Sequence, residues 1–403
     1  MPGFELYDQK EIDAVTDVIK RKMVHRYSFV RTRDEIYRCE EFENAIASKM
    51  GAKYCLAVCN GSAALFVALK ASGLQPGDEV ITTPFTFIAS IEAILENGLV
   101  PVFAEVDESL NLDPRSVVEH ITDRTRAIMP VHMMGGCADM DAFQELCSDY
   151  GLFLFEDACQ AMGAKYRGKY SGTIGKWGTY SLDPYKVLTV GEGGLILTDD
   201  ESLYRRMEYY HDHGHIHNKS IERGAEGKAC LGFNYRMSEM QGAIGLAQLS
   251  KLDMALERMK NNKNRILNEV GAIEGLKLRK SSDMDGETAM NIIYLLPDVK
   301  SARKFQNAVK EHGSACGNLS DNTWHYARHW EVLREYSAKV RANSCCNCGV
   351  SGFFPLYRPN EWPVTHSILE QTAVFGIDIC MSDESMELMA KAIRAGAKAV
   401  GLQ

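Results

Sequence analysis

The sequence predicts an α/β protein with a mostly parallel central sheet and a smaller α+β region toward its C-terminal end. Three observations lead to this prediction. Short apolar runs alternate with segments of helical periodicity through the first half of the chain. A long helical stretch, from Ser238 to about Ala272, then leads away from the sheet. Because the pattern changes after it, we expect a large domain over residues 1–250 and a smaller one over 251–403.

The expected elements of the sheet follow in order along the chain. The strand-like runs are EVITTPFTF, VPVFAEVD, TRAIMPVH and GLFLFEDA. The helices expected between them are GSAALFVALKASGL, DPRSVVEHI and DMDAFQELCSDYG. Alternation of this kind predicts parallel strands whose faces are covered by helices. The smaller region is expected to end in a helix with the sequence SDESMELMAKAIRAGAKAV.

Charge and terminal sequence exclude several classes of partner. The chain of 403 residues carries a formal net charge of −9 and no long basic run, so a nucleic-acid or anionic-membrane binder is not expected. The first residues contain acids and no continuous apolar segment, which predicts neither a signal peptide nor a membrane span. We therefore expect a cytoplasmic protein that acts on a small ligand.

The twelve cysteines are scattered, which predicts reduced thiols. The cluster NSCCNCG, with Cys345, Cys346 and Cys348, is the exception. A metal or iron–sulfur site would need a fourth ligand at matching spacing, and the neighbouring sequence offers none. No metal is expected.

Ligands in open α/β sheets bind at the carboxyl ends of the strands, so the loops that follow the strands are the candidate site. In CNGSAALFVAL, Asn60 and Gly61 form a turn before an apolar helix. The free amides at the helix start and the Ser62 hydroxyl would bind a phosphate. The alternative is that Ser62 only caps the helix.

Two further loops carry aromatic and acidic groups. In TTPFTFIAS, Phe85 is interpreted as a core residue, while Phe87 is either core or a flat face for a heteroaromatic ring. In FLFEDACQAMGA, adjacent acids are followed by Gln160. Asp157 is either a helix cap or a buried carboxylate that keeps a pyridine nitrogen protonated.

The fourth loop, SLDPYKVLTVGEGGLILTDD, places Lys186 between a strand-like run and a glycine-rich turn. Lysine is the side chain that forms a Schiff base with an aldehyde, and desolvation favours the neutral amine that attacks. The four loops together offer a phosphate cradle, a stacking face, an acid and an amine. Pyridoxal 5′-phosphate has a partner for each, so we expect it as the cofactor.

These loops also resemble a known family. The motifs NGSAAL, PFTFIAS, EDACQAMGA, SLDPYK with GEGG, and GFNYRMSEMQGAIGLAQL are similar to those of the DegT/DnrJ/EryC1/StrS aminotransferases. The resemblance implies fold type I of the pyridoxal-phosphate-dependent transferases, as in aspartate aminotransferase. It implies Lys186 as the Schiff-base lysine and Asp157 as the partner of the ring nitrogen. The remaining cofactor contacts that it implies are Ser62, Ala63, Phe87, Gln160 and Ser181.

The resemblance also bears on assembly and on the lysine loop. Asn234, in GFNYR, would reach the phosphate bound by the other subunit, which implies a homodimer with shared active sites. After Ser181 the family usually has an aromatic residue, where this chain has Leu182. Asp183 and Pro184 are likewise not the commonest residues at their positions.

The segments MPGFEL, HRYSF, HDHGHIH and TWHYARHW lie outside the cofactor motifs. They resemble the branch of the family that aminates a Kdo-type octulosonate, an eight-carbon keto sugar of lipopolysaccharide. We therefore expect them on the substrate side of the site, with His213, His215, Trp324 and His325 as candidate substrate contacts. The alternative to substrate contact, for each histidine, is a structural role in which its ring is hydrogen-bonded within the protein.

The resulting prediction is an aminotransferase that moves an amino group, with L-glutamate as the expected donor, to a keto sugar. A nucleotide-linked keto sugar is the alternative acceptor. Two other classes are kept open. A sugar dehydratase of this family would have histidine in place of Lys186, and a noncatalytic regulator would bind the cofactor without turnover.

Overall fold

The computed structural model describes residues 3–27, 33, 35–221, 223–341, 354–358 and 360–402. The cluster of Cys345, Cys346 and Cys348 lies outside these residues, as do the last two residues of the HRYSF segment. The nine described cysteines are all free thiols. No helix in the described ranges is both long and apolar enough to cross a bilayer.

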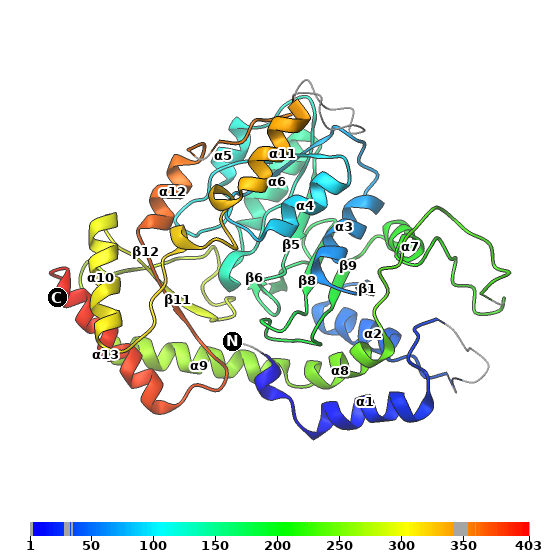
Figure 1. Cartoon of the computed structure of the whole chain (residues 1–403), viewed down its shortest axis with the longest axis horizontal. Helices are drawn as coiled ribbons and strands as arrows, with labels where there is room; N and C mark the ends of the chain where they lie inside the picture. The colour runs from blue at the N-terminus through cyan, green and yellow to red at the C-terminus, as the bar shows by residue number, and fades with distance from the viewer. Residues whose placement is uncertain are drawn as a thin grey trace.

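A mostly parallel sheet forms the centre of the larger region, as predicted (Figure 1). Among the described residues it has seven strands in the order β1-β9-β8-β5-β4-β2-β3. Their bounds are β1 Tyr54–Val58, β2 Glu79–Thr82, β3 Val100–Phe103, β4 Thr125–Ile128, β5 Phe153–Asp157, β8 Trp177–Ser181 and β9 Gly194–Thr198. Only β9 runs against its neighbours among these strands. Because β1 and β8 both pair antiparallel with β9, they run in the same direction as β5 and β2.

Strands β2 and β4 are shorter than the sequence pattern predicts, and a proline follows shortly after each of them. The run from Glu79 was expected to continue to Phe87, but β2 ends at Thr82, shortly before Pro84. Strand β4 ends at Ile128, shortly before Pro130. Proline has no backbone N–H and cannot extend the hydrogen-bonded ladder.

Helices cover both faces of the sheet, as parallel strands require. Adjacent residues of β2 point to opposite faces of the sheet. Val80 packs in one apolar cluster with α3 and α4, and Ile81 packs in another with α5 and α6. The helices are α2 Arg38–Met50, α3 Gly61–Ala71, α4 Ile88–Glu96, α5 Pro114–Glu119, α6 Met140–Tyr150 and α7 Glu201–Tyr210. Helices α3, α5 and α6 were expected from the sequence. Their N-cap residues are Asn60, Asp113 and Asp139, and each cap side chain accepts a hydrogen bond from a backbone N–H of the first turn.

The long helical stretch from Ser238 is two helices rather than one. Helix α8 spans Glu239–Leu249 and α9 spans Leu252–Val270. The break falls where the chain is tied to the N-terminal helix α1 (Gln9–Arg21). Lys251 donates to Glu11 Oε2 at 2.8 Å, and Gln248 donates to the other oxygen of the same buried carboxylate at 2.8 Å. These contacts hold the end of α8 against α1 (Figure 1).

The C-terminal part forms the smaller α+β region. Its antiparallel sheet has the order β10-β11-β12, and α10 and α13 pack together beside it (Figure 1). The elements are β10 Lys277–Leu278, β11 Asn291–Leu295, α10 Val299–Glu311, α11 Glu331–Arg341, α12 Pro363–Glu370, β12 Thr372–Gly376 and α13 Asp383–Ala399. One apolar cluster joins Phe42 of α2, Met259 of α9 and Phe305 of α10. The domain boundary at residue 250 therefore stays a prediction.

Candidate active site

The candidate site lies at the carboxyl edge of the central sheet. Because β1, β2, β5 and β8 run in one direction, the loops after them reach the same edge. They enclose a cavity of about 600 Å³. The predicted site residues that line it are Ser62, Phe87, Asp157, Gln160, Ser181, Lys186, Trp324 and His325.

Lys186 stands in the loop between β8 and β9, and its side chain is 18% exposed. Its Nζ lies 3.4 Å from Asp183 Oδ2, and its backbone N–H donates to the Asp183 carbonyl at 3.1 Å. The glycine-rich turn that follows is needed for close packing. A Cβ on Gly194 would overlap the carbonyl oxygen of Asn60, so only glycine lets β9 start against the loop after β1.

The expected phosphate cradle lies between α3 and the end of β8. Asn60, not Ser62, caps α3, since its Oδ1 accepts a hydrogen bond from Ala63 N at 2.7 Å. The interpretation of Ser62 as a helix cap is therefore wrong, and its exposed side chain lies at the cavity instead. Ala63 is buried, lies outside the cavity lining, and its amide is already used by Asn60. The opposite wall is Ser181.

Gly61 is where this cradle is tightest. A Cβ on Gly61 would lie 2.7 Å from the Cβ of Ser181 and 2.9 Å from its Oγ. We expect Gly61→Ala to lower the free energy of unfolding by about 1–3 kcal/mol through overpacking, and to weaken cofactor binding. Chemical denaturation and absorbance titration with the cofactor measure the two effects. Gly376→Ala, where an added Cβ has open space, is the control; an equal effect of both substitutions would contradict the prediction.

Asp157 ends β5 and is 3% exposed. Its Oδ2 accepts a hydrogen bond from Ser90 Oγ at 2.6 Å, and its Oδ1 accepts one from Cys159 N at 3.1 Å. No helix follows in residues 158–164, so the interpretation of Asp157 as a helix cap is wrong. The carboxylate begins a turn and borders the cavity.

The neighbouring acid has a different role. Glu156 is fully buried, and its two oxygens accept backbone N–H groups of Gly172, Ile174 and Gly175. His132 Nε2 lies 3.0 Å from the same carboxylate. Glu156 therefore holds the chain before β8 in place, and only Asp157 of the two acids borders the cavity.

Aromatic groups and an amide complete the described lining. Phe85 is fully buried, as predicted, whereas Phe87 is 38% exposed at the cavity. The Phe87 ring lies 6.4 Å from Trp324 and 5.8 Å from His325, measured between centroids. Burial, together with the nearby Lys186 ammonium, lowers the pKa of His325 to about 4, although the Asp183 carboxylate acts in the opposite direction. Its imidazole is therefore neutral near pH 7.

The amide of Gln160 also lines the cavity. Gln160 Oε1 accepts a long hydrogen bond of 3.5 Å from Met134 N.

Three predicted residues lie outside this cavity, in the segment from Asp212 to Arg236. His213 is exposed, with a positive φ of 54°. His215 is held between Glu226 and Lys228, which matches the structural alternative for this histidine. Asn234 is exposed, so its predicted contact with the partner's phosphate stays a prediction.

Comparison with known proteins identifies the family. A sequence profile of the DegT/DnrJ/EryC1/StrS aminotransferase family matches residues 7–351. The chain belongs to this family. The predicted family, the aminotransferase class and the cofactor of that class, pyridoxal 5′-phosphate, are thereby confirmed.

Individual relatives agree with this assignment. GDP-perosamine synthase of Caulobacter vibrioides is 43% identical over 53% of this chain and 56% of its own length. Spore coat polysaccharide biosynthesis protein SpsC of Bacillus subtilis is 35% identical over 74% of this chain and 75% of its length. The match to the first of these thus spans little more than half of that relative. Neither name points to an octulosonate, so the finer resemblance stays a prediction.

Solved structures with the same fold cover nearly the whole chain. An aminotransferase from Psychrobacter cryohalolentis is 28% identical, with a TM-score of 0.79 and 96% of each chain covered. 3-Amino-5-hydroxybenzoic acid synthase is 26% identical, with a TM-score of 0.77 and coverage of 98% of this chain and 97% of the other. These matches confirm the predicted fold type.

The groups around the cavity fit the cofactor of this family. An amine, a buried carboxylate and a half-exposed phenyl ring border one space, and the tight packing of Gly61 on Ser181 brings the backbone of α3 close to the end of β8. The amine suits an aldehyde, the carboxylate suits a protonated ring nitrogen, and the start of α3 suits a phosphate. Pyridoxal phosphate carries each of these groups.

The sequence did not point to two side chains that shape the site. Ser90 of α4 binds the Asp157 carboxylate across 67 positions in the chain, and Asp183 contacts Lys186. The sequence places Ser90 in the same PFTFIAS motif as Phe87, and the structure places it in the first turn of α4, directly after Phe87. The signal for Asp183 is its departure from the commonest family residue.

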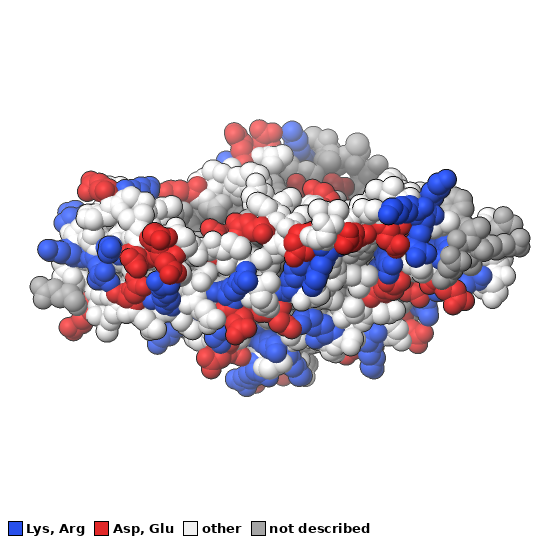
Figure 2. All heavy atoms as spheres, turned by 90° about the horizontal axis from the view of Figure 1, so that it is seen from below, with Lys and Arg blue, Asp and Glu red and all other residues white. Residues whose placement is uncertain are grey.

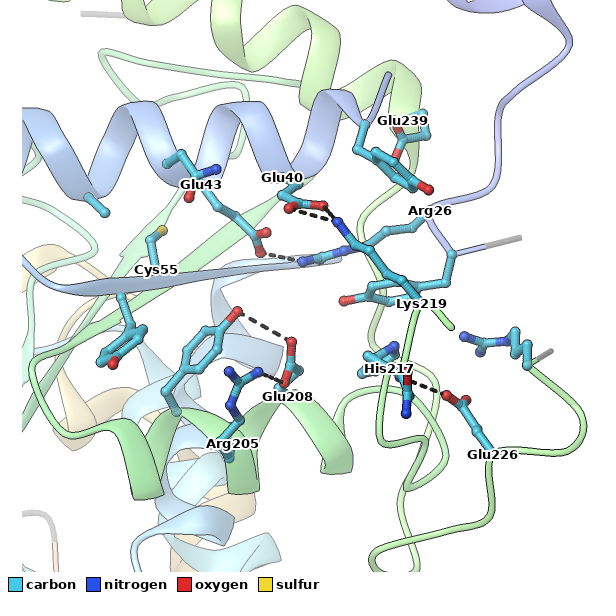
Figure 3. Close-up of a pocket in the computed structure, with 18 of the residues that line it drawn as sticks. Arg26, Glu40, Glu43, Cys55, Arg205, Glu208, His217, Lys219, Glu226 and Glu239 are labelled. Carbon is cyan, nitrogen blue, oxygen red and sulfur yellow. Dashed lines mark hydrogen bonds and ion pairs between the residues drawn. The ribbon is translucent and has the colours of Figure 1, made fainter. Parts of the chain in front are cut away.

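A second cavity, of about 380 Å³, lies elsewhere (Figure 3). It is bordered by α2, the first residues of β1 and α7, and its described lining contains none of the predicted site residues. Three ion pairs join side chains of its lining: Arg26 with Glu43, Lys219 with Glu40, and Arg205 with Glu208. Two other charged lining residues pair with groups outside it, Arg223 with Asp212 and Glu226 with His215. Because these charges are already neutralised, we do not assign the reaction to this cavity.

The charged side chains on the face seen from below do not form a surface that would bind a polyanion. Figure 2 shows that the acidic and basic side chains of the described residues are interspersed across this face and form no continuous basic region among themselves. A nucleic-acid interface needs clustered positive charge.

Proposed function

We propose that this chain is a pyridoxal-phosphate-dependent aminotransferase that moves an amino group from L-glutamate to a keto sugar. One observation carries the proposal: the amine of Lys186 and the buried carboxylate of Asp157 border the same cavity, next to the start of α3. The relatives named for sugar pathways support the acceptor class.

Each residue has a distinct task in the proposed reaction. The bound cofactor supplies an aldehyde and an electron-accepting ring. Lys186 would hold the cofactor through its Nζ, and once the donor has taken its place the free amine would take a proton from the donor's Cα and pass it on to the former aldehyde carbon. Asp157, oriented by its hydrogen bond from Ser90, would keep positive charge on the ring nitrogen. Phe87 offers a flat contact for the ring.

Two acceptors remain candidates, each with its own support. The segments HDHGHIH and TWHYARHW favour a free Kdo-type keto sugar, and Trp324 and His325 of the second segment border the cavity. The names of the relatives favour a nucleotide-linked sugar, since GDP-perosamine synthases also occur in Escherichia coli O157:H7 and Vibrio cholerae among the matches. The free sugar is the reading we propose first.

A spectrum of the holoenzyme tests the activity itself. Adding glutamate should convert the visible absorbance of the lysine-bound cofactor to that of its amine form, and a keto sugar should restore it. Restoration by 8-keto-octulosonate or by GDP-4-keto-6-deoxymannose distinguishes the acceptors. Absence of any change with glutamate, glutamine or other donors would leave a noncatalytic role, as the name of the Pleiotropic regulatory protein of Geobacillus stearothermophilus suggests for that relative.

The proposed homodimer gives a separate prediction. If Asn234 reaches the partner's phosphate, a Lys186→Ala chain and an Asn234→Ala chain should each be inactive alone. Mixed dimers should recover up to about a quarter of wild-type activity, because one of the two sites in each heterodimer is then intact and half of the dimers are heterodimers. Subunit exchange is checked with differently tagged chains. No recovery despite proven exchange would contradict shared sites.

A further inference from the structure

Asp183 is the feature of the cavity that the family resemblance leaves unexplained. It occupies the loop that carries Lys186, at a position where this chain departs from the commonest family residue. Its side chain is 32% exposed and borders the cavity. Oδ2 lies 3.4 Å from Lys186 Nζ and accepts a hydrogen bond from Ser181 Oγ at 3.2 Å.

The loop does not need the negative charge of this side chain. Oδ1 accepts a hydrogen bond from Tyr185 N at 2.7 Å, which forms a turn that asparagine makes equally well. Pro184 restricts the backbone of the same turn. The negative charge of Asp183 therefore acts on Lys186, the group that Oδ2 faces.

Among the described residues that line the cavity, Asp183 is the counter-ion of Lys186. Lys186 carries the only positive charge among the described side chains that line the cavity. His325, on the opposite wall, is neutral because burial lowers its pKa to about 4. Asp157 is bound to Ser90, and Glu192 is exposed. Of the carboxylates that line the cavity, only Asp183 forms an ion pair with Lys186 within the described residues.

We infer that Asp183 is a positioning residue for the released amine of Lys186. Once the donor has displaced Lys186 from the cofactor, the side chain is free to turn away from the reacting carbon. The Asp183 carboxylate would accept a hydrogen bond from the neutral amine and pair with the ammonium that it becomes. Nζ would then stay at the cavity while it takes the proton from the donor's Cα and delivers it to the former aldehyde carbon, which leaves the amine neutral again. This inference rests on the proposed function.

The test compares Asp183→Asn with the wild type in two ways. In the apoprotein, the amine of Lys186 should react with acetic anhydride at least about threefold faster in the variant, because it is no longer held. Mass spectrometry of the digest measures this, with exposed Lys70 as the internal reference. In the holoenzyme, the maximal rate of the glutamate half-reaction should fall at least about tenfold, with little change in the glutamate concentration at half-maximum.

Further variants separate positioning from a structural role. Asp183→Glu should recover part of the rate, because it restores a carboxylate within reach of Nζ. Asp113→Asn replaces another turn-forming carboxylate, which accepts from Arg115 N at 2.9 Å, and should leave both measurements unchanged. Cofactor affinity of Asp183→Asn should stay within about twofold of wild type, since the turn is retained.

Three results would overturn the inference: unchanged acetylation of Lys186, an unchanged half-reaction, or loss of cofactor binding in Asp183→Asn. The last would show that the charge serves loading rather than positioning. Failure of the proposed function is distinguishable, because then the wild type itself shows no half-reaction with any donor, while the acetylation of the apoprotein still reports the contact between Asp183 and Lys186.

Discussion

Replacing Lys186 with alanine is expected to abolish covalent attachment of the cofactor and to lower the amino-transfer rate by about a thousandfold or more. No other described lysine lines the cavity, so nothing nearby can take over the amine. Reduction of the wild-type holoenzyme with borohydride, followed by peptide mapping, should place the cofactor on Lys186 alone. The variant should show no such adduct and no band of the lysine-bound form.

Two controls guard this prediction against loss of structure. Lys70→Ala removes an exposed lysine at the end of α3 and should leave attachment and rate unchanged. Lys186→Arg keeps a long cation in the loop beside Asp183 but cannot form the linkage, so it should be folded, by circular dichroism, and inactive. If Lys186→Ala still carries the cofactor covalently and turns over, the assignment of the site is wrong.

Convergence of the site was predictable because it depends on strand direction. Apolar runs and intervening helices predict parallel strands, and parallel strands deliver their following loops to one edge. Phe87, Asp157 and Lys186 are far apart in sequence, yet they border one cavity for this reason. The residue types in those loops then indicate the ligand chemistry. These steps need only local pattern and topology, both of which the sequence carries.

Other features depend on contacts that no local pattern encodes. The sequence leaves open whether Ser62 caps α3 or binds a ligand, and it does not indicate that Asn60 provides the cap, as the structure shows. The contact between Ser90 and Asp157 joins helix α4 to the end of strand β5. At the break before α9, Lys251 contacts Glu11, which lies 240 residues away in the sequence.

The segment from Asp212 to Arg236 shows another limit. Its apolar side chains include Leu231, 95% exposed, and Phe233, 62% exposed. Exposed groups of this size favour a surface that contacts another chain. The residues predicted there, His213, His215 and Asn234, do not border the cavity of their own chain. The proposed contact of Asn234 with a partner's phosphate therefore stays a prediction.

The charge of Asp157 is the second decisive feature, and Asp157→Asn isolates it. The substitution should preserve the fold, because asparagine can accept the hydrogen bond from Cys159 N and form the same turn. It should also preserve attachment of the cofactor through Lys186. The reaction should nevertheless slow by about a thousandfold or more, because a neutral amide cannot hold positive charge on the ring nitrogen in a buried site, a loss of about 4 kcal/mol or more.

Half-reaction kinetics with glutamate decide between this catalytic role and a structural one. If the carboxylate served only the turn and Ser90, the amide would replace it with little loss, and Asp157→Asn would behave like Asp139→Asn. That control exchanges an acid for an amide at the start of α6, where the side chain accepts from Ala142 N at 3.3 Å and asparagine caps equally well. A rate for Asp157→Asn within about threefold of wild type, about 0.6 kcal/mol, would remove Asp157 from the proposed reaction.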